Sequence, residues 1–269
     1  MESHCGEAVF VARGDTPQAQ NLVSEILIFR AGGQHMYQLK GKVRYSEADS
    51  QERLTYAALL NYFQDSSTLH SETLGASGKS LYENQMAWIL SFWQICIEDM
   101  PKLSEDIVVS TWPYDTKGLF GMRNFCMEDA EGRRLASANS IWVLINTENG
   151  RPIKIPTEVG ALYPDEPRLE MDYCERKIII PNEYEAKEPI RVPGYFIDTN
   201  HHMNNGKYVM VAEEYLPEGF KLREIRVEYK KPAVLNDLLY PRVTIGEQEV
   251  TVVIADAEGK PYATVLFKA

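Results

Sequence analysis

Hydrophobic and polar residues alternate along the chain from Tyr37 onward, and this period of two predicts a half-buried strand over residues 37–45. The next stretch, Thr55 to His70, is apolar almost all round in its first turns, which is typical of a buried helix. Further strand-like runs follow at residues 87–97, 107–112, 120–127 and 135–145. The first half of the chain is therefore predicted to form a strand, a long helix and a group of strands.

The second half repeats this order of elements. The pattern predicts a strand over residues 189–197, a helix over residues 207–216 that Pro217 ends, and strands over residues 222–230, 238–245, 249–255 and 262–267. A D-A-E-G turn joins two predicted strands at Asp129 and again at Asp256, with glycine supplying the turn geometry. This internal repetition indicates an α+β fold in which each antiparallel sheet packs on one helix.

These patterns divide the chain into four parts. Residues 36–149 are expected to form the first repeat and residues 189–269 the second, with the proline-containing residues 150–188 as a linker between them. Residues 1–35 show no sustained period, and they lack the basic start and the long apolar run of a signal peptide. We therefore expect a poorly ordered N-terminal extension that contributes little to the fold.

The composition narrows the class of protein. Hydrophobic residues make up 44% and charged residues 25% of the 269 residues, and no apolar run is long enough to span a membrane. The net charge of −11 argues against nucleic-acid binding, which needs a basic face. The four cysteines form no C-x-x-C pair and no zinc-like spacing. We therefore expect a cytoplasmic protein without a metal or cofactor, and with neither nucleic acid nor membrane as its partner.

The stretch "FIDTNHHMNNGKYV", at the start of the second predicted helix, concentrates polar side chains that can carry chemistry. His201 and His202 are two of the five histidines in the chain, and Asp198 precedes them. A turn-forming role is the simpler alternative for Asp198, and Asn204 and Asn205 are expected to cap the helix. A metal site made by Asp198 and the two histidines is disfavoured, because adjacent histidines rarely point at one ion.

The chain from Tyr37 to Ala269 resembles the acyl-ACP thioesterases, enzymes that release fatty acids from acyl carrier protein. The resemblance rests on "YAALLNYFQDSSTLHSETLG", "GLFGMRNF", "SANSIWVLINTENGRPIKIP", "DTNHHMNNGKYV" and "IRVEYKK", which occur in the family's order. It implies a double hotdog fold, in which two long helices are each wrapped by an antiparallel sheet. It also implies hydrolysis of fatty acyl-[acyl carrier protein] to free fatty acid, with acyl carrier protein as partner. Two such repeats already form an internal pseudo-dimer, so a monomer and a homodimer both remain open.

The family's catalytic motif, Asp-x-Asn-x-His, falls on Asp198, Asn200 and His202. The resemblance implies that Asp198 is the general base or the nucleophile, that Asn200 orients water or the thioester, and that His202 assists by sharing a proton. Free N–H groups at the start of the following helix suit the developing oxyanion. Plant members carry Glu and Cys where this chain has Pro232 and Ala233, so the attack is expected to come from the Asp198 side.

The first repeat is expected to carry no chemistry. When Tyr56 is aligned with Tyr208, residues Ser46–Ser50 fall opposite the motif, and the Asp-x-Asn-x-His set is missing. In the family this half shapes the acyl tunnel, and five residues are candidates to line one here: Leu59, Leu60, Tyr62, Phe63 and Trp88. Plain core packing is the alternative for these side chains, and it is the better one for most of them.

We therefore expect an acyl-ACP thioesterase. An acyl-CoA thioesterase is the nearest alternative, and a non-catalytic hotdog module that binds acyl thioesters and a hotdog hydratase are the others. Acyl carrier protein is acidic, so the surface of this protein to which it docks should be locally basic. Basic residues cluster in sequence at and after the motif, namely Lys207, Lys221, Arg223, Arg226, Lys230 and Lys231. A solvated polar face is the alternative for this cluster.

Overall fold

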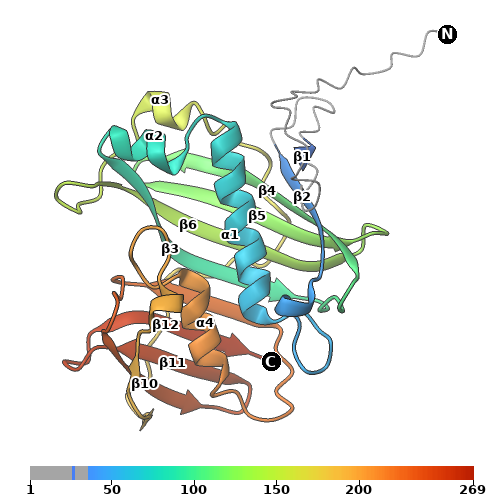
Figure 1. Cartoon of the computed structure of the whole chain (residues 1–269), viewed down its shortest axis with the longest axis vertical. Coiled ribbons are helices and arrows are strands. Elements are labelled where there is room, and N and C mark those ends of the chain that lie inside the picture. The colour runs from blue at the N-terminus through green and yellow to red at the C-terminus, as the bar shows by residue number, and fades with distance from the viewer. Residues whose placement is uncertain (1–25, 28–35) are drawn as a thin grey trace, which may run out of the picture.

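Two repeats of strand, helix and antiparallel strands make up the computed structural model, which describes residues 26–27 and 36–269 (Figure 1). The first contains β2 (Tyr37–Lys42), η1 (Tyr45–Glu47), α1 (Tyr56–Thr73), α2 (Gly78–Glu83), β3 (Met86–Ile97), β4 (Asp106–Lys117), β5 (Phe120–Asp129) and β6 (Arg134–Asn146). The second contains β8 (Ile190–Arg191), η2 (Gly194–Phe196), α4 (Asn205–Glu213), β9 (Glu224–Tyr229), β10 (Leu238–Ile245), β11 (Glu249–Ala255) and β12 (Pro261–Lys268). Between them lie α3 (Thr157–Gly160) and β7 (Glu185–Ala186). The predicted α+β fold is confirmed.

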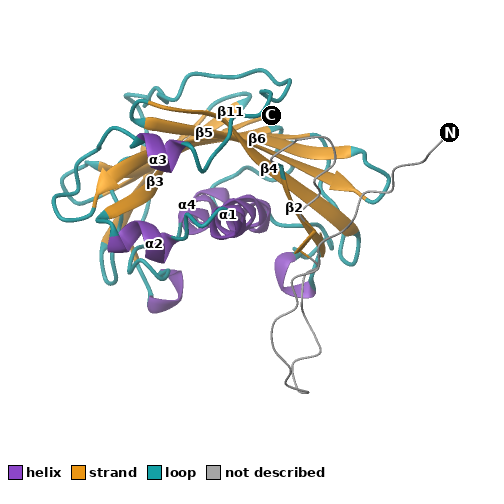
Figure 2. Cartoon of the chain, turned by 90° about the horizontal axis from the view of Figure 1, so that it is seen from above, coloured by secondary structure: helices purple, strands orange, loops and turns teal. Residues whose placement is uncertain are grey.

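All strands belong to one antiparallel sheet, which also includes β1 (Ile26–Leu27). Their order is β1-β2-β4-β5-β6-β3-β9-β12-β11-β10-β7, and β8 pairs with β10. The repeats join where β3 pairs with β9, with Trp93 opposite Val227 and Ile95 opposite Ile225, all four of them fully buried. Figure 2 shows the sheet arching over α1 and α4, which lie side by side on its concave face. This arrangement is the expected double hotdog.

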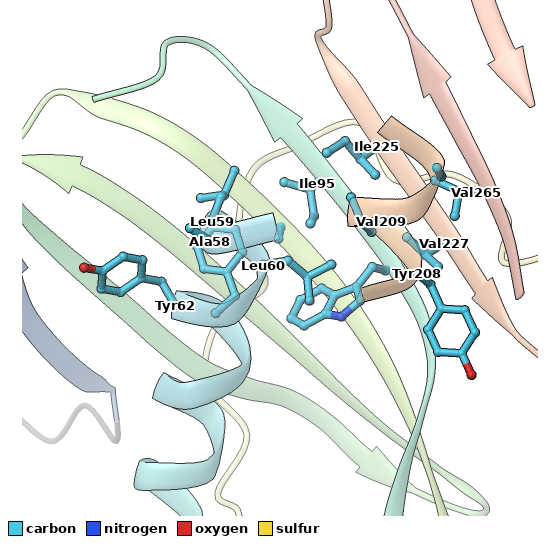
Figure 3. Packing of buried hydrophobic residues seen from close by; sticks show 14 of the residues in the cluster. Ala58, Leu59, Leu60, Tyr62, Ile95, Tyr208, Val209, Ile225, Val227 and Val265 are labelled. Carbon is cyan, nitrogen blue, oxygen red and sulfur yellow. The ribbon is translucent and has the colours of Figure 1, made fainter. Parts of the chain in front are cut away.

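The N-terminal end of α1 and its apolar face explain why this helix forms and where it lies. The Thr55 hydroxyl accepts a hydrogen bond from the N–H of Ala58 (3.2 Å) and so caps the helix. Leu59, Leu60 and Phe63 are fully buried in the main hydrophobic core, as Figure 3 shows for the two leucines. Tyr62 belongs to the same core, so four of the five candidate tunnel residues pack in it. None of the helices in the described residues is long and apolar enough to cross a membrane.

Residues 189–197 do not form the single strand that the pattern predicts. Only Ile190–Arg191 pair with β10, and Gly194–Phe196 form a 3-10 helix. Prolines explain the difference, because Pro189 and Pro193 have no N–H to donate to a neighbouring strand. The chain therefore turns early, and this turn leads directly into the motif.

The N-terminal extension contains one short strand among the described residues. Residues 1–25 and 28–35 lie outside the described residues, so the expectation for them stays a prediction. Between these two segments, β1 pairs with β2 in antiparallel register. One short strand therefore lies within residues 1–35, and the expectation that this extension contributes little to the fold stays a prediction.

Buried amide side chains bind the chain between the repeats to the outer face of the sheet. Gln94 of β3 donates to the carbonyl oxygen of Asp172 (2.8 Å) and accepts from the N–H of Cys174 (3.0 Å). Asn124 of β5 accepts from the N–H of Leu169 (3.0 Å). Both amides are almost fully buried, and these bonds satisfy polar groups that would otherwise lie unpaired. This connection is therefore part of the packed structure.

One acidic side chain at the contact between α1 and α4 is buried without full hydrogen bonding. Glu213, at the end of α4, has a buried oxygen Oε2 that makes no hydrogen bond with any described residue. Burial, followed by the charges of Glu214 and Asp49, raises the pKa of Glu213 to about 7. Burial and then the nearby Glu213 carboxylate also raise the pKa of Tyr56, at the start of α1, and Arg53 opposes this effect.

We expect Glu213→Gln to stabilise the protein above neutral pH. The folded state binds the Glu213 proton more tightly than the unfolded chain does. The stability that this proton contributes is therefore complete below about pH 4.5 and is lost as the pH rises through about 7. The free energy of unfolding of the variant should exceed that of the wild type by about 3 kcal/mol at pH 8 and match it near pH 4.

Urea denaturation at the two pH values measures this difference. Glu214→Gln is the matched control, because Glu214 is the exposed neighbour on the same helix. Its free energy of unfolding should differ from that of the wild type by less than about 0.5 kcal/mol. Equal stability of Glu213→Gln and the wild type at pH 8 would contradict the prediction.

Candidate active site

Asp198 organises the loop that carries the predicted catalytic residues. Its N–H donates to the carbonyl oxygen of His202 (2.8 Å), and its side-chain oxygen Oδ1 accepts from the N–H groups of Asn200 (2.8 Å) and His202 (3.4 Å). His201 has a φ of 61°, a left-handed conformation that closes the turn. The turn-forming role considered for Asp198 is therefore confirmed, and it leaves the second carboxylate oxygen available for chemistry.

The three motif side chains come from one short turn between η2 and α4. Asp198 and His202 are partly buried, whereas Asn200 is exposed, as is His201. Asp198 contacts the other two motif residues through their main chain only, because both of its side-chain hydrogen bonds go to backbone N–H groups. The structure thus brings the three residues together on one turn without hydrogen bonds between their side chains.

The N-terminus of α4 follows this loop and offers a hydrogen-bond donor. Asn204 caps the helix, since its Oδ1 accepts from the N–H of Gly206 (2.9 Å) and its carbonyl oxygen from the N–H of Lys207 (2.9 Å). The N–H of Asn205 makes no hydrogen bond with any described residue. The cap prediction is confirmed for Asn204. It is wrong for Asn205, whose side chain instead donates to Gln64 of α1 (3.0 Å).

Ala233 anchors the loop through its main chain. Its carbonyl oxygen accepts from the N–H of Met203 (2.8 Å), and its N–H donates to the hydroxyl of Tyr208 in α4 (2.9 Å). Burial raises the pKa of Tyr208 to about 12, so the phenol stays neutral. Ala233 is fully buried and Pro232 is exposed, and neither side chain can act as acid, base or nucleophile. No reactive side chain therefore stands at these two positions.

The first repeat contains a second loop with the same backbone geometry. Asp49 Oδ1 accepts from the N–H groups of Gln51 (2.7 Å) and Arg53 (2.9 Å), and the Asp49 N–H donates to the carbonyl oxygen of Arg53 (2.8 Å). Glu52 has a φ of 60°. Each of these features matches one in the loop at Asp198, so Asp49 corresponds to Asp198.

This match corrects the register expected from the sequence. Tyr56 corresponds to Asn205 and not to Tyr208. Gln51 and Arg53 take the places of the motif's Asn and His, so the complete Asp-x-Asn-x-His set is absent from this loop, as predicted. Aligning the two Asp residues, each of which precedes a capping Thr or Asn, would have revealed the correct register.

The other residues singled out in the sequence take several roles. The Tyr62 hydroxyl donates to Glu47 (2.8 Å), and Trp88 packs in a smaller hydrophobic cluster with Tyr163. In the basic cluster, three side chains form ion pairs with neighbouring carboxylates: Arg226 with Glu224, Lys230 with Glu228, and Lys231 with Asp256. The cluster is therefore not one uncompensated basic surface. Lys207, in the first turn of α4, lies over the ring of Phe196 (5.7 Å).

Two residues of α1 reach this site, and the sequence analysis did not single them out for it. Gln64 binds Asn205, as described above. Asn61 lies so close to Gly206 that a Cβ on this glycine would be 2.6 Å from Asn61 Oδ1. Both come from the first repeat, so no motif in the second half of the sequence could reveal them.

Comparison with protein families matches nearly the whole described chain. The model of the acyl-ACP thioesterase N-terminal domain matches residues 34–163, and that of the acyl-ACP thioesterase C-terminal domain matches residues 181–258. Among individual proteins, the chain is 26% identical over 215 residues to a palmitoyl-acyl carrier protein thioesterase of Arabidopsis thaliana. It is 23% identical over 226 residues to a dodecanoyl-[acyl-carrier-protein] hydrolase of Cinnamomum camphora.

These alignments cover 73% and 76% of this chain but 52% and 58% of the plant proteins, so the chain spans little more than half their length. Among solved structures, an acyl-ACP thioesterase from Bacteroides thetaiotaomicron has a TM-score of 0.80 at 21% identity, covering 87% of this chain and 97% of that one. A 12:0-ACP thioesterase from Umbellularia californica has a TM-score of 0.77 at 19% identity, with the same coverage of both chains. These two structures show the same fold. Because its two domain models together match more than half of the chain, the protein belongs to the acyl-ACP thioesterase family.

Proposed function

We propose that the protein hydrolyses the thioester of fatty acyl-[acyl carrier protein] and releases free fatty acid, which ends chain elongation in fatty acid biosynthesis. The observation that carries this proposal is the placement of the Asp198, Asn200 and His202 motif against the N-terminus of α4. The names of the relatives support the same substrate class. Acyl carrier protein is then the partner that presents the acyl chain.

The geometry supports a water-mediated attack driven by Asp198. The carboxylate oxygen that does not hold the loop takes a proton from water, and the water oxygen attacks the thioester carbonyl carbon. The developing oxyanion lies at the free N–H of Asn205, where the helix end is also positive. Asn200 orients the water or the carbonyl. The C–S bond then breaks, and the proton reaches the leaving thiolate with the help of His202.

Asp198 could instead attack the carbonyl directly and form an acyl-enzyme anhydride. A single turnover in water labelled with oxygen-18 identifies the direct route where the anhydride is hydrolysed at the Asp198 carbon, because only then does the label enter the enzyme. Water-mediated attack and hydrolysis of the anhydride at the acyl carbon both place the label in the fatty acid, so trapping is needed to separate them. Trapping of an acyl-enzyme by rapid denaturation is the positive sign of the nucleophilic route in both cases.

Turnover measurements test the function itself. Purified protein is incubated with acyl-ACP and with acyl-CoA of the same chain length, and free fatty acid is quantified. Faster release from acyl-ACP supports the proposal, and faster release from acyl-CoA favours the acyl-CoA thioesterase. Tight binding of acyl thioesters without turnover favours the non-catalytic module.

We expect Asp198→Asn to abolish most of the activity without unfolding the loop. Asparagine keeps an Oδ1 acceptor for the N–H groups of Asn200 and His202, but it cannot take a proton from water. The kcat should fall roughly 10²–10⁴-fold, while KM and the melting temperature stay close to those of the wild type. Steady-state kinetics and thermal denaturation measure these values. Retention of most of the wild-type kcat would refute the role of Asp198.

The adjacent histidines should respond differently to substitution. His202→Ala should lower kcat roughly 10²-fold, and the combination with Asp198→Asn should cost little beyond Asp198→Asn alone, because the groups act as a unit. His201→Asn is the matched control, since asparagine tolerates the left-handed φ of 61° and keeps the turn closed. Its kcat should stay within about twofold of the wild type. If kcat fell as much in His201→Asn as in His202→Ala, the assignment of the catalytic role to His202 and not to His201 would be wrong.

Lys207 is the basic residue best placed to meet an acidic carrier protein near the site. No carboxylate of the described residues pairs with it, unlike Lys230 and Lys231. Lys207→Glu should raise KM for acyl-ACP several-fold and leave KM for a neutral acyl-N-acetylcysteamine thioester unchanged. Lys102→Glu, on an exposed position in the first repeat, is the control. Equal changes of KM for both substrates would remove docking as the explanation.

A further inference from the structure

We propose that Gln64, a residue of the first repeat, is a positioning residue of the active site in the second repeat. The inference rests on the proposed thioesterase function and adds a residue that the catalytic motif does not contain. Gln64 lies on α1, and its role is to hold Asn205, the first residue of α4, in place.

Asn205 is held from two sides by different elements. Its side-chain amide donates to Oε1 of Gln64 (3.0 Å), and its carbonyl oxygen accepts from the hydroxyl of Tyr229 in β9 (3.0 Å). Burial raises the pKa of Tyr229 well above 10, so this hydroxyl remains a donor. With both ends fixed, Asn205 has little freedom to turn.

The fixed residue also has an N–H that is free to meet the substrate. The next N–H, that of Gly206, is already bound by Asn204 (2.9 Å), so Asn205 provides the first free N–H of α4. Such a donor is effective only if it already points at the place where negative charge develops. Asn61 adds a second contact from α1, because it packs directly on Gly206. The first repeat therefore sets the position of the helix end that faces the thioester.

The contact between α1 and α4 contains a second pair of residues that corresponds to Gln64 and Asn205, and the two pairs can be compared. By the correspondence of Asp49 with Asp198, Glu213 takes the place of Gln64 and Tyr56 that of Asn205. There the side chains form no such amide pair, and Glu213 Oε2 makes no hydrogen bond with any described residue. The amide pair thus occurs at the helix end that carries the complete motif.

A double-mutant cycle tests the proposal. Gln64→Met keeps the length of the side chain and removes the acceptor, and Asn205→Ala removes the donor. Each single variant should lower kcat roughly tenfold, because the N–H of Asn205 is no longer fixed, while KM stays within about twofold. The double variant should be no slower than Asn205→Ala, since Gln64 acts through Asn205. Melting temperatures of all variants are measured alongside, and Gln64→Ala replaces Gln64→Met if the latter does not fold.

Glu213→Gln is the control at the matching position, and its kcat should stay within about twofold of the wild type. A wild-type kcat in Gln64→Met, or losses that simply multiply in the double variant, would overturn the proposal while leaving the thioesterase function intact. A rise in KM with an unchanged kcat would also overturn it, because it would show a role in substrate binding. If the wild type hydrolysed no acyl thioester, the proposed function and this inference would both fail.

Discussion

The absence of a side chain at Gly206 allows α1 and α4 to lie in close contact. A Cβ there would lie 2.6 Å from Asn61 Oδ1, so either the Asn61 side chain would have to turn away or the two helices would have to move apart. In the second case Leu60 and Val209, both fully buried in the main core, would lose part of their burial. Full burial of one such side chain contributes about 1.5–3 kcal/mol, whereas glycine in a helix costs about 1 kcal/mol. Close contact is therefore favoured, and it places α1 against the candidate active site.

The loops at Asp49 and Asp198 show that different residues determine the backbone shape and the chemical side chains of the motif. Both loops are closed by an aspartate that accepts two main-chain N–H groups and by one residue with a left-handed φ. None of these contacts needs the asparagine and histidine side chains of the motif. Gln51 and Arg53 can therefore replace them in the first repeat while the turn keeps its shape. Chemistry was free to differ between two loops whose geometry stayed the same.

Much of the fold followed from the sequence, because each main element has its own local signal. The alternation in Leu238–Ile245 and the apolar turns of α1 appear in the structure within a few residues of where they were predicted. The strand expected over residues 189–197 failed because prolines outweighed the hydrophobic pattern. For the site, Asp198, Asn200 and His202 lie on one short turn and could be found as a motif. Gln64 could not, because its contact with the site depends on how the two repeats pack.

Main-chain hydrogen bonds anchor the loop at Asp198, and they determine which substitutions there affect stability. Met203 and Ala233 are joined through main-chain atoms, and the Ala233 N–H is bound by Tyr208 from within α4. A substitution that changes only the side chain at Asn200, which is exposed, leaves all of these bonds in place. Loss of activity and loss of stability are therefore largely separate events in this loop. At Gly206 they are coupled, since a side chain there would disturb both the contact with Asn61 of α1 and the end of α4 that follows the motif.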